Sequence, residues 1–441
     1  MEDSFLINGG NPLRGDVTLS GAKNVALKVT IAALLFHGKV ILRNIPRISD
    51  IFEIFSLINN LGGRAEFIDT NEVIIDSKNL SVYKLDFLYA SKIRTSFMFF
   101  APLLYRFNKA LIPNPGGCRL GARSIDRIVE GLNALGIQVD YDSSTGYYRA
   151  EMNKKPFGEY RFIKPSHTGT ELLIMMSVFC KNAVVIHNCA LEPEIDDLIL
   201  FLNQSGANIQ KNGTTITIHG VDKLVQKTPY TIVSDRNEAV TYAIAGIITR
   251  GDVVIHSVSE NYIAYFINQL KEIGAGVECK NDNTWRFYYK NPLKPSKIVT
   301  NPHPGFMTDW QPNWAVLMTQ ANGVSTIHER VFENRFSYVD ELVKVGAKIE
   351  FFQPEVNSPA SYYHFSYDKN KTYKQAIKIY GPQTLHNGVL KISDLRAGAT
   401  LALAAFITKG ETIINNVSIL ERGYENFVNK IIKLGGDIKK L

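Results

Sequence analysis

Apolar and polar positions repeat one pattern along this chain: a short apolar strand, a polar loop, a helix, a turn centred on glycine, and another strand. The six central glycines are Gly62, Gly136, Gly206, Gly274, Gly346 and Gly435. Their spacings are 74, 70, 68, 72 and 89 residues. A near-constant period predicts supersecondary units that bury their apolar faces against one another. A chain of 441 residues can hold six such units as two groups of three.

A second helix in each unit reads as apolar nearly all round, which predicts burial. The first turn of each of these helices is polar. These polar heads are Ser20–Asn24, Ser91–Ser96, Ser166–Glu171, Ser234–Ala239, Thr308–Asn313 and Ser393–Gly398. Serine and threonine are favoured N-cap residues, so we expect Ser20, Ser234 and Ser393 to cap their helices.

Several of these heads carry a cation: Lys23, Arg94, Arg236 and Arg396. A cation near a helix N-terminus opposes the helix dipole by about 0.3–1 kcal/mol, so a bound anion would explain the pattern. If three units close around a pseudo-threefold axis, their helix N-termini converge. Two groups facing each other would then form an interdomain cleft lined by these cations.

The segment 353–383 interrupts the last period, is rich in Tyr, Asn and Lys, and has Pro near both ends. It reads as an inserted hairpin or excursion. The net charge of +7 is spread along the chain, which disfavours a nucleic-acid interface. No apolar run approaches the roughly 18 residues of a membrane span, and the N-terminus lacks a signal-peptide pattern, so we expect a cytoplasmic location.

The loop Pro113–Arg123 is the longest stretch rich in Gly and Pro, and it places Cys118 between two glycines and the cations Arg119 and Arg123. Nearby positive charge lowers a thiol pKa and attracts anions. The loop alone is also compatible with an ordinary exposed cysteine. The four cysteines form no CxxC pair, which disfavours a metal site or a disulfide framework. A dinucleotide site is excluded because no GxGxxG opens a helix after a strand.

Seven short motifs together resemble one family, the enolpyruvyl transferases, and they span the chain from Phe5 to Leu441. The motifs are SerGlyAlaLysAsn at 20–24, ProGlyGlyCys-x-x-GlyAlaArg at 115–123, GluProGluIle at 192–195, ThrAspTrpGln at 308–311, ValPheGluAsnArgPhe at 331–336, AspLeuArgAla at 394–397 and ArgGlyTyrGlu at 422–425. Each motif alone is weak. Their order along the chain makes the resemblance specific.

The resemblance implies an α/β fold of two inside-out prism domains, each built from three repeated β/α units. The first lobe would be 22–232, carrying the cysteine loop at 113–123. The second lobe would be 1–21 plus 233–441, with the insertion at 353–383. In this family the chain crosses between the lobes twice, so the strand Leu6–Asn8 would join the second lobe.

The implied activity is a carboxyvinyl transfer: the enolpyruvyl group of phosphoenolpyruvate passes to the 3-hydroxyl of UDP-N-acetylglucosamine, and phosphate is released. This reaction opens peptidoglycan precursor synthesis. No metal or organic cofactor is expected, the partners are these small substrates rather than nucleic acid or membrane, and the chain would be a monomer or a weak homo-oligomer.

The resemblance also assigns residues. The implied catalytic residues are Cys118 as general acid, Asp309 beside the acceptor hydroxyl, and Lys23 and Arg422 for the anionic substrates. The implied substrate-binding residues are Asn24, Arg94, Arg123, Ser124, Ile125, Asp126, Arg127, Lys164, Ser166, His167, Thr168, Gly169, Val331, Arg335 and Arg396. A thiol can give and take a proton near neutral pH, and a carboxylate in reach of a hydroxyl can act as base.

The head Ser166–Glu171 departs from the SerValGlyAlaThr typical of the family, because it introduces His167 and Glu171. His167 is either a new substrate contact or a residue bonded locally in the first helical turn. The departure keeps open an enolpyruvyl transferase acting on another uridine nucleotide, such as UMP, in a secondary pathway. A catalytically silent binding protein is disfavoured, since Lys23, Cys118, Asp309 and Arg422 are all present.

Overall fold

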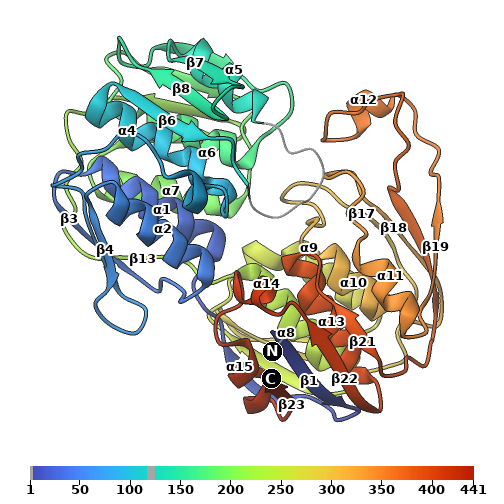
Figure 1. Cartoon of the computed structure of the whole chain (residues 1–441). Coiled ribbons are helices and arrows are strands. Elements are labelled where there is room, and N and C mark those ends of the chain that lie inside the picture. The colour runs from blue at the N-terminus through green and yellow to red at the C-terminus, as the bar shows by residue number, and fades with distance from the viewer. Residues whose placement is uncertain (1–2, 117–124) are drawn as a thin grey trace. The chain divides into compact units, whose positions relative to one another are not determined.

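A computed structural model describes residues 3–116 and 125–441 of the chain (Figure 1). Its contacts divide the chain into two compact units. The central unit comprises the described residues between Gly21 and Val233. The terminal unit contains the chain up to Ser20 together with Ser234–Leu441. Each unit is described by itself.

The central unit alternates helices with short strands. Its strands are β3 (Lys39–Arg43), β4 (Arg64–Phe67), β5 (Val73–Asp76), β6 (Lys109–Pro113), β7 (Gln138–Asp142), β8 (Tyr147–Glu151), β9 (Gly158–Arg161), β10 (Val184–His187), β11 (Asn208–Asn212), β12 (Thr215–His219) and β13 (Tyr230–Thr231). Its helices are α1 (Lys23–Ala32), η1 (Ala33–Leu35), α2 (Ser49–Asn60), α3 (Phe87–Ala90), η2 (Arg94–Phe99), α4 (Phe100–Phe107), α5 (Asp126–Ala134), α6 (His167–Ser177) and α7 (Pro193–Gln204).

The terminal unit has the same alternation. Its strands are β1 (Ser4–Gly9), β2 (Arg14–Thr18), β14 (Asp252–His256), β15 (Gly276–Asn281), β16 (Thr284–Tyr288), β17 (Lys297–Val299), β18 (Gly323–His328), β19 (Lys348–Phe352), β20 (Ala376–Gly381), β21 (Val389–Lys391), β22 (Gly410–Asn415) and β23 (Asp437–Lys440). Its helices are α8 (Arg236–Ile248), α9 (Glu260–Glu272), α10 (Gln311–Met318), α11 (Tyr338–Lys344), α12 (Pro359–Tyr362), α13 (Leu395–Ile407), α14 (Ser418–Glu421) and α15 (Phe427–Lys433).

Three small sheets form in each unit. The central unit has the orders β13-β3-β5-β4, β6-β8-β7 and β11-β12-β10-β9. The terminal unit has β21-β22-β1-β23, β15-β16-β14-β2 and β17-β18-β20-β19. Each four-stranded sheet is mixed, because one edge strand is parallel to its neighbour and the remaining pairs are antiparallel. The fold is therefore α/β with several mixed sheets.

Two edge strands join sheets that belong to the other part of the chain. Strand β2 precedes α1 in the sequence but pairs in parallel with β14, in register from Arg14 with Asp252 to Thr18 with His256. Strand β13 precedes α8 but pairs in parallel with β3. Strand β1 lies between β22 and β23, beside the C-terminal strand (Figure 1). The chain thus passes between the two units twice, as the resemblance implied, and Leu6–Asn8 belongs to the terminal unit.

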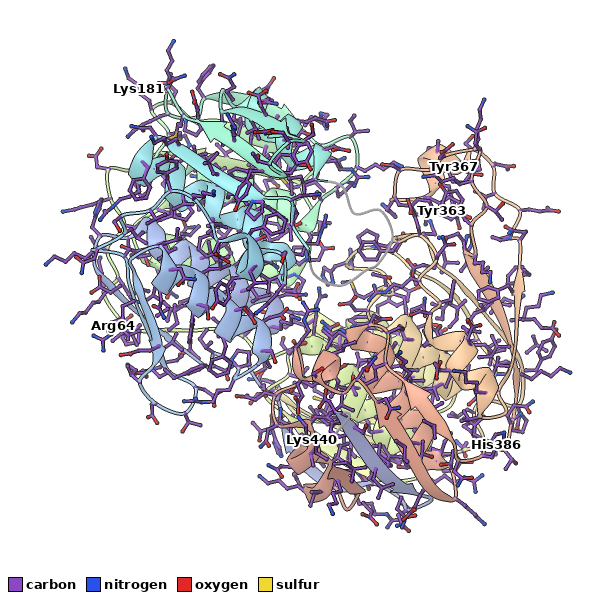
Figure 2. All side chains as sticks on the ribbon, in the orientation of Figure 1. Arg64, Lys181, Tyr363, Tyr367, His386 and Lys440 are labelled. Carbon is purple, nitrogen blue, oxygen red and sulfur yellow. The ribbon has the colours of Figure 1, made fainter. Side chains whose placement is uncertain are left out.

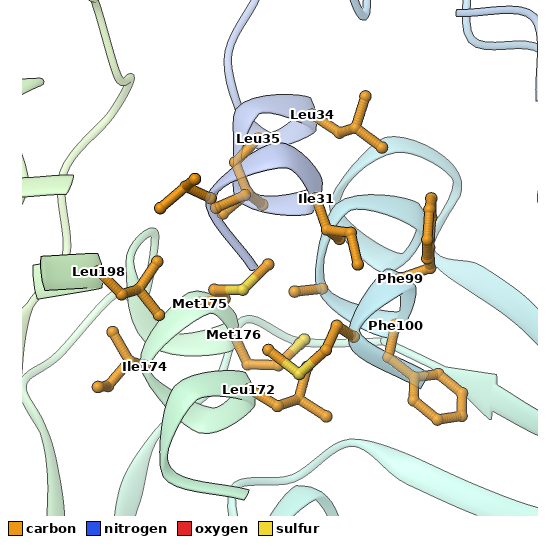
Figure 3. Packing of buried hydrophobic residues seen from close by; sticks show 14 of the residues in the cluster. Ile31, Leu34, Leu35, Phe99, Phe100, Leu172, Ile174, Met175, Met176 and Leu198 are labelled. Carbon is orange, nitrogen blue, oxygen red and sulfur yellow. The ribbon is translucent and has the colours of Figure 1, made fainter. Parts of the chain in front are cut away.

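Buried helices form the interior of each unit. Every residue of α8 and α10 is buried, and nearly every residue of α1, α6 and α13. Figure 3 shows part of this packing in the central unit, in which Ile31 of α1, Phe100 of α4, and Leu172 and Met175 of α6 belong to one buried apolar cluster. Helices that are apolar all round need protein on all sides, so the sequence prediction of buried helices is confirmed.

The six glycine-centred turns share one hydrogen-bonded geometry. All six central glycines have positive φ, between 83° and 103°. In every turn the residue after the glycine donates its N–H to the carbonyl five residues before it, as in Ala207 to Leu202 at 3.0 Å and Gly436 to Ile431 at 3.0 Å. This is the Schellman motif, in which glycine tolerates the left-handed conformation that closes a helix. The repeated LeuGly and ValGly signals of the sequence therefore have a common physical origin.

The predicted serine caps are wrong at three of the helices. The N-cap of α8 is Asp235, whose carboxylate accepts from the N–H groups of Asn237 and Glu238. Asp394 caps α13 in the same way, one residue after Ser393. Helix α1 begins after Ala22, which offers no side-chain cap, and Ser20 Oγ instead accepts from Lys430 Nζ. A carboxylate accepts two N–H groups at once and complements the helix dipole, so it displaces the neighbouring serine.

The insertion is shorter than the sequence suggested. Residues Ala376–Gly381 form β20, which pairs with both β18 and β19 inside the sheet. The excursion is the connection 353–375 between β19 and β20, and it contains α12. Tyr363, Phe365 and Tyr373 form a small aromatic core of their own there; Figure 2 labels Tyr363 together with Tyr367. Among the described residues no helix is long and apolar enough to cross a bilayer.

Candidate active site

A carboxylate held by two arginines lies in the terminal unit. Arg335 Nη2 donates to Asp309 Oδ1 at 2.7 Å, and Arg396 Nε lies 3.4 Å from Asp309 Oδ2. The arginine side chains are 3% and 4% exposed, whereas that of Asp309 is 25% exposed. Burial lowers the pKa of Arg335, but the adjacent Asp309 and Asp394 carboxylates raise it overall. Both guanidiniums therefore stay charged beside an accessible carboxylate.

Glu329 is linked to Arg335 through the hydroxyl of Thr308. Arg335 Nη1 donates to Thr308 Oγ1 at 2.8 Å, and Thr308 Oγ1 donates to Glu329 Oε2 at 2.8 Å. The other Glu329 oxygen accepts from the backbone N–H groups of Val331 and Phe332, at 2.7 and 3.0 Å. A buried carboxylate with this many donors is rigidly placed. The network fixes Arg335 and the chain around Val331.

In the central unit, Lys23 opens α1 and its Nζ lies 2.8 Å from Asp50 Oδ2 in the first turn of α2. Both side chains are at most 10% exposed. From the sequence, a bound anion would explain the cation in this head. The chain itself supplies an anion to Lys23, as Asp309 does for Arg396, and Arg236 lies 3.3 Å from His303 Nδ1. The cations of these two heads, Lys23 and Arg396, are therefore balanced by carboxylates of the chain itself.

Two cations lie close together at another point of the central unit. Arg127 is in the first turn of α5, and Lys164 precedes α6 by three residues. Partial burial lowers the pKa of Lys164, and the charge of Arg127 lowers it further. Burial likewise lowers the pKa of Arg127. The nearby carboxylates of Glu130 and Asp126 act in the opposite direction and raise the pKa of Arg127.

The helix α6 begins beside these cations. Ser166 is its N-cap, and its Oγ accepts from the Gly169 N–H at 3.2 Å, as a serine in this position was expected to do. His167 occupies the first helical position, and its Nε2 lies 3.2 Å from Glu171 Oε1. This contact supports the sequence reading of His167 as a locally paired residue, and the reading as a substrate contact stays a prediction. The contact leaves Nδ1 as the ring nitrogen that is not directed at Glu171.

The remaining predicted residues are placed as follows. Asn24 is the second residue of α1, Arg94 opens η2, Ile125 is the buried N-cap of α5, Asp126 is its first residue, Thr168 and Gly169 lie in the first turn of α6, and Arg422 follows α14. The structure thus brings Asp309, Arg335 and Arg396 together in one unit, and Arg127 and Lys164 in the other. Cys118, Arg119, Arg123 and Ser124 lie outside the described residues.

Two other cysteines behave as the sequence suggested. Cys180 and Cys189 are buried. Burial raises the pKa of both thiols, that of Cys189 to about 12. A raised pKa reduces the thiolate fraction near neutral pH, which disfavours a nucleophilic role for either cysteine.

Sequence reasoning missed the roles of four charged residues. These are Lys28, Asp50, Glu329, and Glu171 as the partner of Lys28 and His167. Lys28 is the one charged residue inside the apolar stretch of α1 after its head, and Glu171 begins the apolar stretch of α6. A lone cation and a lone anion in two helices that are both expected to be buried imply that they pair. That signal was available. The role of Glu329 depends on a turn that the sequence does not specify.

A family model described as EPSP synthase (3-phosphoshikimate 1-carboxyvinyltransferase) matches residues 7–431. A UDP-N-acetylglucosamine 1-carboxyvinyltransferase of Finegoldia magna is 36% identical over 433 residues, covering 97% of this chain and 96% of the relative. UDP-N-acetylglucosamine 1-carboxyvinyltransferase 3 of Caldanaerobacter subterraneus subsp. tengcongensis is 36% identical over 440 residues, covering 100% and 99%.

Solved structures agree on the fold. The enolpyruvyl transferase NikO from Streptomyces tendae superposes with a TM-score of 0.85 at 22% identity and covers 100% of this chain and 99% of its own. An EPSP synthase from Acinetobacter baumannii gives a TM-score of 0.74 at 17% identity, with both chains fully covered. The motifs, the mixed sheets and these matches lead to one assignment. This chain belongs to the enolpyruvyl transferase family that the EPSP synthase model describes, and it is a carboxyvinyltransferase.

Proposed function

We propose that this enzyme transfers the enolpyruvyl group of phosphoenolpyruvate to the 3-hydroxyl of UDP-N-acetylglucosamine and releases phosphate, the first step of peptidoglycan precursor synthesis in the cytoplasm. The observation that carries the proposal is the 36% identity to relatives of that name over nearly the full length of both chains. Under this proposal each unit is an inside-out prism of three β/α repeats, and the lobes correspond to 22–232 and to 1–21 plus 233–441.

The reaction is an addition followed by an elimination. The acceptor oxygen bonds to C2 of phosphoenolpyruvate while C3 takes up a proton, which gives a tetrahedral ketal. The C2–O bond to phosphate then breaks, C3 loses a proton, and the enol ether remains on the acceptor. No electrons are gained or lost, and every proton taken up is returned.

Asp309 is our choice for the base that removes the proton from the acceptor hydroxyl. Its contacts suggest how it is controlled. Arg335 and Arg396 contact the carboxylate and stabilise its ionised form. An anionic substrate group that draws one guanidinium away would strengthen the base when the reactants are in place. The 25% exposure of Asp309 leaves it open to an acceptor.

The remaining cations suit the charge of the substrates. Lys23, Arg94, Arg335, Arg396 and Arg422 would hold phosphoenolpyruvate and the departing phosphate, since fixed positive charge stabilises a leaving anion. Another group would hold the acceptor and its diphosphate: Asn24, Arg123, Ser124, Ile125, Asp126, Arg127, Lys164, Ser166, His167, Thr168, Gly169 and Val331. Cys118 would protonate C3 as general acid.

The test is phosphate release from phosphoenolpyruvate with UDP-N-acetylglucosamine, UMP or shikimate 3-phosphate as acceptor in parallel reactions. We expect rapid release with the sugar nucleotide and little with the other two. Turnover with UMP or shikimate 3-phosphate, and none with the sugar nucleotide, would overturn the acceptor assignment.

The role of Cys118 has its own test. Incubation with phosphoenolpyruvate should add the mass of the intact substrate to the protein, and Cys118→Ala should abolish this adduct. Cys279→Ala is the matched control, because Cys279 is an exposed cysteine on β15. An adduct that persists in Cys118→Ala would show that another thiol reacts.

A further inference from the structure

A cluster of three ionisable side chains lies between α1 and α6 of the central unit. Lys28 Nζ is 3.2 Å from Glu171 Oε2, and His167 Nε2 is 3.2 Å from Glu171 Oε1. The side chains of Lys28 and Glu171 are 3% and 0% exposed, whereas that of His167 is 24% exposed. The same two helices contribute Ile31 and Met175 to the buried apolar core of this unit (Figure 3). Only the histidine reaches the surface.

Stability alone does not explain this cluster. Desolvating a carboxylate and an ammonium costs several kcal/mol, and replacing a buried pair with packed apolar residues is often neutral or favourable. Both Glu171 oxygens and His167 Nε2 are buried and lie at ion-pair distance from a partner, without a well-directed hydrogen bond among the described residues. Buried polar atoms in that state call for an explanation beyond packing.

The net charge of the cluster depends on the protonation state of His167. Lys28 and Glu171 balance each other, so the cluster is neutral when His167 is neutral and carries one positive charge when His167 is protonated. That charge would sit at the first position of α6, where a cation opposes the helix dipole unless an anion is bound. Because Nε2 faces Glu171, Nδ1 is the nitrogen that can donate to a ligand when the ring is protonated.

We propose that Glu171 and Lys28 are positioning residues that hold His167 as a protonated donor for a phosphate oxygen of a bound substrate, so that substrate binding depends on the His167 proton. This inference rests on the proposed function for the identity of the substrate. The shared chemistry is a phosphate oxygen, which either the nucleotide diphosphate or phosphoenolpyruvate could provide.

The surrounding charges favour the protonated ring. Burial lowers the pKa of His167, Glu171 opposes this, Lys28 lowers it again, and Glu192 from the segment before α7 raises it. The net effect raises the pKa above 6.5. Glu171 therefore favours the protonated form of His167, and Lys28 places a second cation beside that carboxylate in the apolar interior.

The first experiment measures the His167 pKa by NMR of the imidazole protons in the full chain. The probes are uridine diphosphate and phosphoenolpyruvate, each added alone. We expect one probe to raise the pKa, which identifies the source of the phosphate oxygen. His187 is the matched control, because it also pairs with a glutamate through Nε2, at 3.4 Å from Glu159, but lies on β10. An unchanged His167 pKa with both probes would overturn the inference.

The second experiment follows KM against pH for each substrate. In the wild type, KM for the substrate whose phosphate contacts His167 should rise about tenfold per pH unit above the pKa of the free enzyme. Glu171→Gln should move the start of this rise to lower pH and change KM more than kcat. His167→Gln should remove the rise, and His187→Gln should retain it. Wild-type profiles in both His167→Gln and Glu171→Gln would contradict the proposal.

Folding defects can be separated from these effects. Lys28→Met combined with Glu171→Leu removes both buried charges, so the double variant should fold and should lower the His167 pKa. If the wild type fails to use UDP-N-acetylglucosamine while uridine diphosphate still raises the His167 pKa, the acceptor assignment falls and the positioning role stands. If turnover is normal and the pKa does not respond to either probe, the positioning role falls and the function stands.

Discussion

Arg335 Nη2 donates to Asp309 Oδ1 at 2.7 Å, so the carboxylate that we propose as base is paired with a buried guanidinium. The two residues come from different segments, the head of α10 and the turn before α11. Their contact joins a candidate base to a candidate anion-binding group. Substrate charge can therefore act on the base through the arginine.

Asp309→Asn keeps the size of the side chain and removes the base. We expect kcat to fall by about 10²–10⁴-fold, the usual contribution of general base catalysis. The matched control is Asp252→Asn, which removes a carboxylate that also pairs with an arginine, Arg286 at 2.6 Å, but lies on the sheet strand β14. Phosphate-release kinetics measure both. Near-normal kcat in Asp309→Asn would remove this residue from the base role.

Lys23 and Asp50 allow a structural role to be separated from a catalytic one. Lys23→Met leaves the buried Asp50 without its closest cation and should lower the free energy of unfolding by about 3 kcal/mol. Lys23→Met with Asp50→Asn should recover most of this stability and none of the activity. Urea unfolding and phosphate release provide the two readouts. Recovery of activity in the double variant would show that Lys23 serves only the ion pair.

The turn glycines should differ in their tolerance of alanine. At Gly206 an added Cβ meets no atom within 4 Å, so Gly206→Ala should lose only the about 1–2 kcal/mol of a left-handed backbone. At Gly62 the added Cβ would lie 2.6 Å from Asn79 O and 2.8 Å from Ser81 Oγ. Gly62→Ala should therefore lose more stability, by about a further 1–3 kcal/mol. Equal losses in denaturant unfolding would show that the loop after β5 yields freely.

Asp197 of α7 should make stability depend on pH. Burial raises its pKa from 3.8 to about 6, although Tyr230 Oη, which donates to Oδ1 at 2.7 Å, lowers it. A raised acid pKa means that the native state binds the proton more tightly than the unfolded state. As the pH rises from about 4 to about 6, the unfolding free energy should therefore fall by about 3 kcal/mol.

Asp197→Asn should remove that part of the slope and leave the remainder of the pH profile unchanged. Asp196→Asn is the control, because Asp196 is the neighbouring, exposed residue and its side chain pairs with Lys211. Urea midpoints at half-unit pH steps measure both variants. A wild-type slope in Asp197→Asn would mean that the carboxyl is ionised in the native state across this range.

Much of the local structure was predictable because its signals are local. A Schellman turn needs one glycine after an amphipathic helix, so Gly62 and Gly274 predicted the turns that follow their helices. An all-apolar stretch needs burial, so the apolar run of α13 predicted a buried helix. The motifs around Asp309, Arg335 and Arg396 also identified the family that the comparisons confirm. Each of these is carried by a few neighbouring residues.

The cap residues show where local signals compete. Serine and aspartate stand side by side at 234–235 and 393–394, and both are good caps. Which one caps depends on the residue at which the backbone turns into helix, and that point is set by the strand before it. The predicted end of the insertion was wrong for a similar reason. The stretch before Gly381 reads as polar because it contains lysines, although its Ile377 and Ile379 are buried in the sheet.

The sequence by itself determined the period, the buried helices, the polar heads and the family, because periodicity and turn chemistry act within one unit of the chain. Only the tertiary structure decided that β2 pairs with β14 and β13 with β3, and that Lys28 meets Glu171 across two helices. Such contacts join residues more than 140 positions apart. Their energy comes from desolvation and sheet pairing, which depend on how distant segments pack and not on the neighbours of each residue in the chain.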